Sequence, residues 1–150
     1  GHVGDNEDSL EGSALLKDPS AYYTVPSQAK DYVEKTGVDA LAIAVGTAHG
    51  TYKLPPKLDF DRISEIAKTI DIPLVLHGGS GLSDDDFKTA ISRGISKVNI
   101  FTDINQAGAK AAVGAYTEGK GMTDMILPSI EAVKQSVMTK MRLFHSENRG

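Results

Sequence analysis

The sequence predicts an α/β protein of parallel strands and flanking helices, either a TIM (β/α)8 barrel or a doubly wound sheet. Three short apolar segments, residues 40–46, 73–79 and 97–100, each end in glycine or polar residues. Their apolar residues run without alternation, which is typical of strands buried on both faces of a parallel sheet. Helical patterns separate these segments, so the chain alternates strand and helix as βαβ units do. The spacing is compatible with a barrel, which has roughly 31 residues per unit.

Five helices are expected from apolar periodicity and capping residues. Residues 27–36 have Ser27 as a candidate N-cap and Gly37 just beyond their end. Residues 60–70 and 83–93 separate the later strands, and Ser83 precedes three aspartates that suit a helix N-terminus. Residues 103–116 and 128–144 follow the last strand, joined by a loop over 117–124. The last helix carries one apolar stripe that should cover the barrel or a neighbouring subunit: Ile130, Val133, Val137, Met141 and Phe144.

Composition excludes several classes of function. The 150 residues include 20 acidic and 16 basic side chains, a net charge of −4 that gives no reason to expect nucleic acid as a partner. No apolar run approaches the roughly 20 residues of a membrane span, so we expect no membrane partner and a cytoplasmic protein. Because there is no cysteine, any metal must be held by imidazole, carboxylate or water.

Two histidines at strand ends are candidate metal ligands. His49 follows the first predicted strand, His77 lies near the end of the second, and each precedes a glycine. In parallel sheets the carboxyl ends of strands gather ligands, and neutral imidazole is a common zinc ligand. The alternative is a pair of hydrogen-bonded histidines that finish their strands. His2 and His145 lack such a setting.

The loops after the second and third strands are candidate anion sites. Gly78, Gly79, Ser80 and Gly81 lead into the helix that begins near Ser83, and glycines let backbone amides approach an anion closely. Asn99, Ile100, Phe101 and Thr102 lead into the next helix and add an amide side chain and a hydroxyl. Two ordinary βα turns with capping residues are the alternative interpretation.

Together these segments resemble the class II, zinc-dependent fructose- and tagatose-bisphosphate aldolases. The resemblance rests on TGVDALAIAVGTAHGTYKLPPKLDFDRISEI, PLVLHGGSG and KVNIFTDI in the family's order, with an opening GHVGDNED and an ending MRLFHSENRG. It implies a TIM (β/α)8 barrel, with residues 1–150 as its C-terminal part and the N-terminal half absent from the chain.

The resemblance also implies site roles. His49 and His77 would be two of three Zn²⁺ ligands. Gly50, Gly78, Gly79, Ser80 and residues 99–102 would hold the phosphate of dihydroxyacetone phosphate, beside a monovalent cation (Na⁺ or K⁺). Glu7 would move a proton on that substrate, although GDNED departs from the family's usual pair of glycines.

The implied reaction is reversible cleavage of a ketose 1,6-bisphosphate, fructose or tagatose, to dihydroxyacetone phosphate and glyceraldehyde 3-phosphate. The family's third zinc histidine and its acid/base aspartate belong to an H-x-D-H-like segment that this sequence lacks. We therefore expect the chain alone to be inactive and to need the missing N-terminal barrel half, within a homo-oligomer (dimer or tetramer).

Three other functions remain open at this point. One is a non-catalytic phosphosugar-binding or scaffold fragment. Another is an aldolase for a different phosphorylated keto-sugar. The third is a metal-independent barrel enzyme such as an isomerase.

Overall fold

A computed structural model of the chain describes residues 2–3, 19–47 and 57–148. It divides into two compact units, Gly1–Asn99 and Ile100–Gly150, which are described one at a time.

The first unit contains a parallel sheet whose strands follow one another in chain order. Its strands are β1 (His2–Val3), β2 (Leu41–Ile43), β3 (Leu74–Leu76) and β4 (Ile95–Val98). The predicted strands at 40–46 and 73–79 are confirmed, with shorter bounds. The third prediction, 97–100, was displaced, because pairing with β3 already begins at Ile95. Strand β1 was missed, since two residues carry no periodicity.

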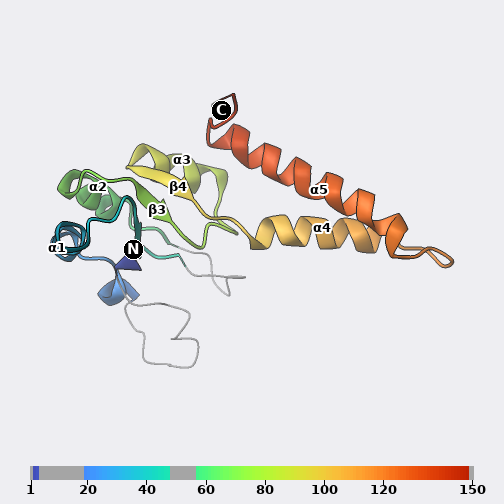
Figure 1. Ribbon diagram of the computed structural model, residues 1–150, viewed down its shortest axis with the longest axis horizontal. Helices are drawn as coiled ribbons and strands as arrows, with labels where there is room; N and C mark the ends of the chain where they lie inside the picture. The colour runs from blue at the N-terminus through green and yellow to red at the C-terminus, as the bar shows by residue number, and fades with distance from the viewer. Residues whose placement is uncertain (1, 4–18, 48–56, 149–150) are drawn as a thin grey trace. The chain divides into compact units, whose positions relative to one another are not determined.

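The order of the described strands favours the barrel over the doubly wound sheet. Helices α1 (Pro26–Thr36), α2 (Phe60–Thr69) and α3 (Asp84–Ser92) make the connections between successive strands. Parallel crossovers are almost always right-handed, so an order that never reverses keeps all the helices on one face. A doubly wound sheet needs a reversal point and helices on both faces. Figure 1 shows α1, α2 and α3 following one another alongside the strands, and the arrangement is that of a TIM barrel.

The core of this unit lies between the sheet and its helices. Ile63 and Ile66 of α2 and Phe87 of α3 are fully buried, and so are Leu41 and Leu76 in the strands. Burial of each such side chain contributes roughly 1.5–3 kcal/mol. The three- and four-residue spacing that predicted α2 therefore marks the face that holds it to the sheet.

Helix capping was predicted correctly for α3 and for the end of α1, but wrongly for the start of α1. The Ser83 hydroxyl accepts from the Asp86 N–H, and the Asp86 carboxylate accepts from the Ser83 N–H, forming a capping box. Helix α1 begins one residue before Ser27, at Pro26, whose fixed φ and missing N–H suit the first helical position. Gly37 ends that helix in the left-handed region, at φ 65°.

The second unit is an antiparallel helical hairpin of α4 (Thr102–Ala115) and α5 (Met122–Leu143) (Figure 1). Helix α5 begins six residues before the predicted start at Pro128, which instead lies inside it. The start is fixed by Asp124, whose carboxylate accepts the Gly121 N–H at 2.9 Å. This acidic residue in the first turn is a stronger start signal than the proline.

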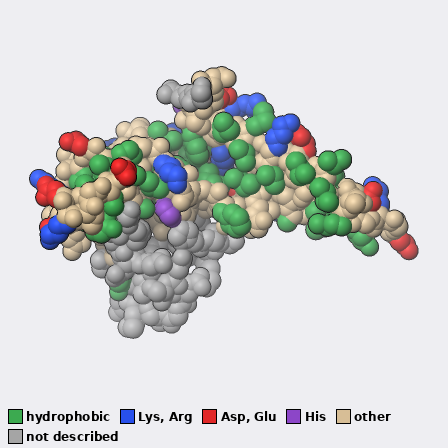
Figure 2. All heavy atoms as spheres, viewed as in Figure 1, with side chains coloured by type: hydrophobic (Ala, Val, Ile, Leu, Met, Phe, Trp, Pro, Cys, Tyr) green, Lys and Arg blue, Asp and Glu red, His purple; other side chains and the backbone are tan. Residues whose placement is uncertain are grey.

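Within the hairpin, part of the predicted apolar stripe of α5 is exposed. Val133 faces Gly108 of α4, where the Ser129 hydroxyl also donates to the Gly108 carbonyl at 2.6 Å. Ile130 is 57% exposed and Met141 42% exposed. Figure 2 shows many hydrophobic side chains on the visible surface of the molecule, and further large exposed ones on this hairpin are Val113, Tyr116, Met122, Ile126 and Leu127. No helix among the described residues is long and apolar enough to cross a membrane.

Replacing Gly46 by alanine should strongly destabilise the protein. Gly46 has φ 104°, and an added Cβ would overlap the Lys57 carbonyl oxygen and lie 2.7 Å from the Tyr23 hydroxyl. Backbone strain and overpacking together should cost about 3 kcal/mol or more in the free energy of unfolding. Gly114→Ala is the control, since its Cβ would meet nothing and α4 should gain about 0.5–1 kcal/mol. Urea unfolding measures both, and equal stabilities would contradict this account.

Candidate active site

A bulge in β4 determines which side chain lies beside His77. Leu74 pairs with Ile95, but Val75 pairs with Lys97, so Ser96 is an extra residue in the ladder. The shifted register continues past the strand ends, where the Asn99 N–H donates to the Leu76 carbonyl at 2.9 Å. An unbroken ladder would place Val98 next to His77. The bulge places Asn99 there.

His77 is held at its backbone and at its ring. The Thr47 hydroxyl, after β2, donates to the His77 carbonyl at 2.7 Å. Asn99 Nδ2 lies 3.1 Å from His77 Nε2. Asn99 is held in turn by Lys97, whose Nζ donates to its Oδ1 at 2.6 Å. The ends of β2, β3 and β4 thus meet at one half-buried imidazole.

The glycine-rich turn after His77 packs against the same asparagine. Gly78 and Gly81 have φ of 65° and 84°, which L-residues with side chains rarely adopt. Ser80 is only 6% exposed. The Gly79 N–H donates to the Asn99 carbonyl at 3.1 Å, so this backbone amide is engaged within the protein. The turn leads directly to Ser83 and the start of α3.

Several residues predicted for the site cannot be placed beside this cluster. Glu7, His49 and Gly50 lie outside the described residues. Ile100, Phe101 and Thr102 open the second unit, where α4 begins at Thr102 and the Phe101 carbonyl accepts the Asn105 N–H at 2.9 Å. Of the predicted residues, the structure brings together His77, Gly78, Gly79, Ser80 and Asn99.

The donor set of this cluster suits one ligand of a metal ion. His77 combines a strand-end position with a half-buried ring, and neutral imidazole is a common metal ligand. Within residues 2–3, 19–47 and 57–148, no group of three or more His, Cys, Asp or Glu side chains could hold a metal by itself. A metal ion bound at His77 would therefore need at least one ligand from outside these residues.

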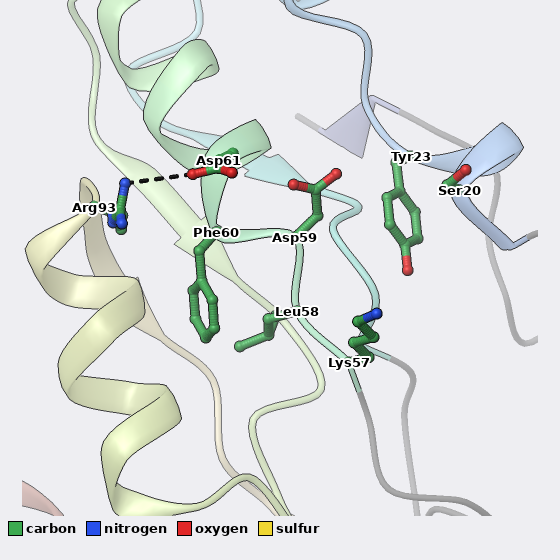
Figure 3. Close-up of a pocket in the computed structure, with 8 residues that line it drawn as sticks. All are labelled: Ser20, Tyr23, Lys57, Leu58, Asp59, Phe60, Asp61 and Arg93. Atoms are coloured by element: carbon green, nitrogen blue, oxygen red, sulfur yellow. Dashed lines mark hydrogen bonds and ion pairs between the residues drawn. The ribbon is translucent and has the colours of Figure 1, made fainter.

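A separate hollow of about 660 Å³ lies at the start of α2 and contains none of the predicted site residues (Figure 3). Tyr23, Lys57 and Phe60 line it, and at its edge Arg93 Nη1 lies 3.5 Å from Asp61 Oδ1. The residues that line this hollow include an ion pair and aromatic side chains, and together they do not indicate one class of ligand. The catalytic prediction therefore stays with the His77 cluster.

Two contacts of the cluster were missed by sequence reasoning. Lys97 was assigned to the strand start, although residues two apart on a strand share a face and so bring Lys97 to Asn99. The Thr47 hydrogen bond joins two different strand ends, and only the sheet order could have revealed it.

Comparison with known proteins places this barrel segment in a defined family. The family model "Fructose-bisphosphate aldolase class-II" matches residues 1–149. The chain belongs to the class II fructose-bisphosphate aldolase family.

Solved structures agree with this assignment. The YdjI aldolase of Escherichia coli K12 is 40% identical, with a TM-score of 0.79 over 86% of this chain and 48% of that one. A Coccidioides immitis protein provisionally described as a fructose-1,6-bisphosphate aldolase is 24% identical, with a TM-score of 0.80 over 99% of this chain and 52% of that one. The fructose-bisphosphate aldolase of Campylobacter jejuni is 22% identical, with a TM-score of 0.69 over 88% and 48%. These last two show likeness of fold alone, and the chain spans about half the length of all three.

Removing the Thr47 hydroxyl should loosen the His77 backbone. Thr47→Val keeps the shape of the side chain but leaves the His77 carbonyl without this donor, which should cost about 1 kcal/mol in the free energy of unfolding. Thr47→Ser retains the hydroxyl and should lose much less. Denaturant titration of both variants checks the expectation, and a valine variant as stable as the serine variant would contradict it.

Proposed function

We propose that this chain contributes to the active site of a zinc-dependent aldolase that cleaves a ketose 1,6-bisphosphate, fructose or tagatose. The products would be dihydroxyacetone phosphate and glyceraldehyde 3-phosphate, and the reaction is reversible. The proposal is carried by the position of His77 at a strand end, between Asn99 and a glycine-rich turn. Family membership over residues 1–149 supports it.

In this proposal His77 and His49 are two of the zinc ligands, and the third comes from the other half of the barrel. A zinc ion held there would polarise the ketose carbonyl and stabilise the negative charge that develops on its oxygen. Imidazole ligands fit the cysteine-free composition, and a catalytic zinc needs three protein ligands and an open position.

The glycine-rich turn and the segment after β4 would hold a substrate phosphate. Gly50, Gly78 and Ser80 would supply backbone N–H or hydroxyl groups, and Gly79, whose N–H donates to the Asn99 carbonyl, would shape the turn. Asn99, Ile100, Phe101 and Thr102 lead into the N-terminus of α4. Helix N-termini and left-handed glycine turns suit anions. A monovalent cation, Na⁺ or K⁺, would lie near this loop. Holding the phosphate fixes the ketose for cleavage, which lowers its entropic barrier.

Carbon–carbon cleavage also requires proton transfers. A base removes the proton of the C4 hydroxyl, the C3–C4 bond breaks to release the aldehyde, and C3 of the remaining fragment then takes a proton. We assign proton transfer on the dihydroxyacetone phosphate fragment to Glu7. The acid/base aspartate would come from the other barrel half, so residues 1–150 would be inactive alone.

The same reasoning predicts two partners for the chain. Residues 1–150 would form the C-terminal part of a single barrel, completed by an N-terminal half, and whole barrels would associate as a dimer or tetramer. Large apolar side chains on the α4–α5 hairpin support the need for association, since Leu127 is 74% exposed and Ile130 57% exposed. Sedimentation of the separate chain should show self-association or aggregation. A soluble, well-folded monomer would contradict this proposal.

Replacing His77 should remove both the metal and the activity. In the complete protein, His77→Ala should lower zinc affinity and aldol cleavage by on the order of 100-fold or more, because a lost ligand costs more than a lost outer hydrogen bond. His145→Asn is the control, since His145 is exposed at φ 52°, which asparagine tolerates. Zinc content and a coupled cleavage assay measure both variants.

The outcomes of this test separate the remaining functions. Full activity of His77→Ala without metal would contradict the proposal and favour a metal-independent barrel enzyme. Zinc binding without cleavage of any ketose phosphate would favour a phosphosugar-binding scaffold. Cleavage of a different phosphorylated keto-sugar, with neither fructose nor tagatose 1,6-bisphosphate accepted, would keep the aldolase chemistry and correct the substrate.

A further inference from the structure

The backbone just beyond β2 is held by residues that belong to no strand. The described strand pairs of β2 end at Ile43. The Ala44 N–H donates to the Thr24 hydroxyl at 2.9 Å, and the Thr24 N–H donates to the Ala44 carbonyl at 2.9 Å. The next carbonyl, that of Val45, accepts the Asp59 N–H at 3.0 Å. Because Thr24 is fully buried, its two hydrogen bonds are shielded from water and are stronger for it.

Arg62, in the first turn of α2, joins the two residues that hold this backbone. Its Nη1 donates to the Thr24 carbonyl at 3.3 Å, and its Nε lies 3.7 Å from Asp59 Oδ2. The Arg62 and Asp59 side chains are only 26% and 32% exposed. A planar guanidinium presents donors in fixed directions, so it can hold a carbonyl and a carboxylate at the same time. One side chain therefore links α2 to both supports of the β2 end.

The supported backbone leads directly to the contact that holds His77. Thr47 lies two residues beyond Val45, and its hydroxyl donates to the His77 carbonyl at 2.7 Å. Gly46, between them, packs closely against the Lys57 carbonyl, which leaves little room to absorb a shift of the chain. A hydrogen bond between two oxygens keeps its strength over only a few tenths of an ångström. The Thr47–His77 bond therefore depends on where Val45 is held.

We propose that Arg62 is a positioning residue, which fixes the end of β2 through Thr24 and Asp59 so that Thr47 can hold His77. Its side-chain hydrogen bond and ion pair go to Thr24 and Asp59, so it acts on His77 only through other residues. The alternative is an arginine that merely stabilises the start of α2, whose loss would leave the Thr47–His77 bond intact. The value of a fixed His77 for catalysis rests on the function proposed above, while the chain of contacts does not.

The ¹³C resonance of the His77 carbonyl tests this directly, because a carbonyl resonance moves when a hydrogen bond to its oxygen is lost. The experiment uses metal-free complete protein labelled with ¹³C-carbonyl histidine, at one fixed pH. His77→Asn identifies the signal by its loss, and Thr47→Val gives its position without the hydrogen bond. Arg62→Met, which keeps an apolar stem, should move the resonance toward the Thr47→Val position. A resonance that stays at the wild-type position would overturn the proposal.

The matched control is Arg93→Met. Arg93 also contacts α2, through Asp61 at 3.5 Å and Ser64 at 3.4 Å (Figure 3), but it bonds to neither Thr24 nor Asp59. It should leave the His77 carbonyl resonance unchanged, and a shift as large as that of Arg62→Met would overturn the specific role of Arg62.

A milder variant keeps the test valid if Arg62→Met does not fold. Asp59→Asn retains a good helix N-cap and the backbone bond to Val45, but it removes the charge that holds the Arg62 guanidinium. The His77 carbonyl resonance should move in the same direction as in Arg62→Met, by a smaller amount. An unchanged resonance in folded Asp59→Asn would then overturn the proposal.

Kinetics of the complete, zinc-loaded protein provide a second measurement. Arg62→Met should lower kcat/KM for the ketose bisphosphate about 10- to 100-fold, as small misplacements of reacting groups do. The loss should fall mainly on kcat, because Arg62 contacts none of the groups proposed to hold the phosphate. If Arg62 acts through Thr47, the Arg62→Met/Thr47→Val double variant should lose little more than Thr47→Val alone. Losses that multiply would overturn the proposal.

The two measurements distinguish this proposal from the proposed function. If the wild type cleaves no ketose phosphate but the carbonyl resonance moves in Arg62→Met, the aldolase proposal fails and the positioning role of Arg62 stands. If cleavage occurs and the resonance does not move, the reverse holds.

Discussion

The extra residue in β4 is the constraint on which the candidate site depends. Ser96 shifts the register between β3 and β4 by one residue, and side chains on neighbouring strands can meet only if the register aligns them. With the shift, a polar amide lies next to His77. Without it, the apolar Val98 would lie there, and the ring would lose the hydrogen bond that orients it. The insertion of Ser96, an exposed residue, therefore determines which side chain lies beside His77.

The remaining features of the site follow from that alignment. Asn99 makes three contacts at the ends of the strands. Its backbone carbonyl accepts from the Gly79 N–H in the glycine-rich turn, and its side-chain oxygen accepts from Lys97. Its NH₂ group faces His77. Thr47 ties the β2 end to the same histidine. Because all of these contacts except Lys97–Asn99 join the ends of adjacent parallel strands, the singly wound order of the sheet is as important as any one side chain. The chain in which these contacts occur belongs to the class II fructose-bisphosphate aldolase family.

Sequence reasoning predicted the elements well and their edges less well. Continuous apolar runs identified β2 and β3, and the spacing of Ile63 and Ile66 identified α2, because burial leaves a periodic signal. The predicted start of α5 at Pro128 was wrong, because the helix already begins at Met122, where the Asp124 carboxylate accepts the Gly121 N–H. The bulge at Ser96 and the Thr47–His77 bond leave no local signal, since they depend on pairing between distant segments. Strand-end position predicted His77 and Asn99 as site residues, but only the register shows that they touch.

The central claim is that His77 is a ligand of one zinc ion shared with His49. A crystal structure of the complete, zinc-loaded protein, with anomalous scattering measured at the zinc edge, tests it most directly. The account predicts one zinc peak at about 2.0–2.1 Å from a ring nitrogen of His77 and at a similar distance from His49. A zinc peak elsewhere, or His77 and His49 rings too far apart to share an ion, would contradict it.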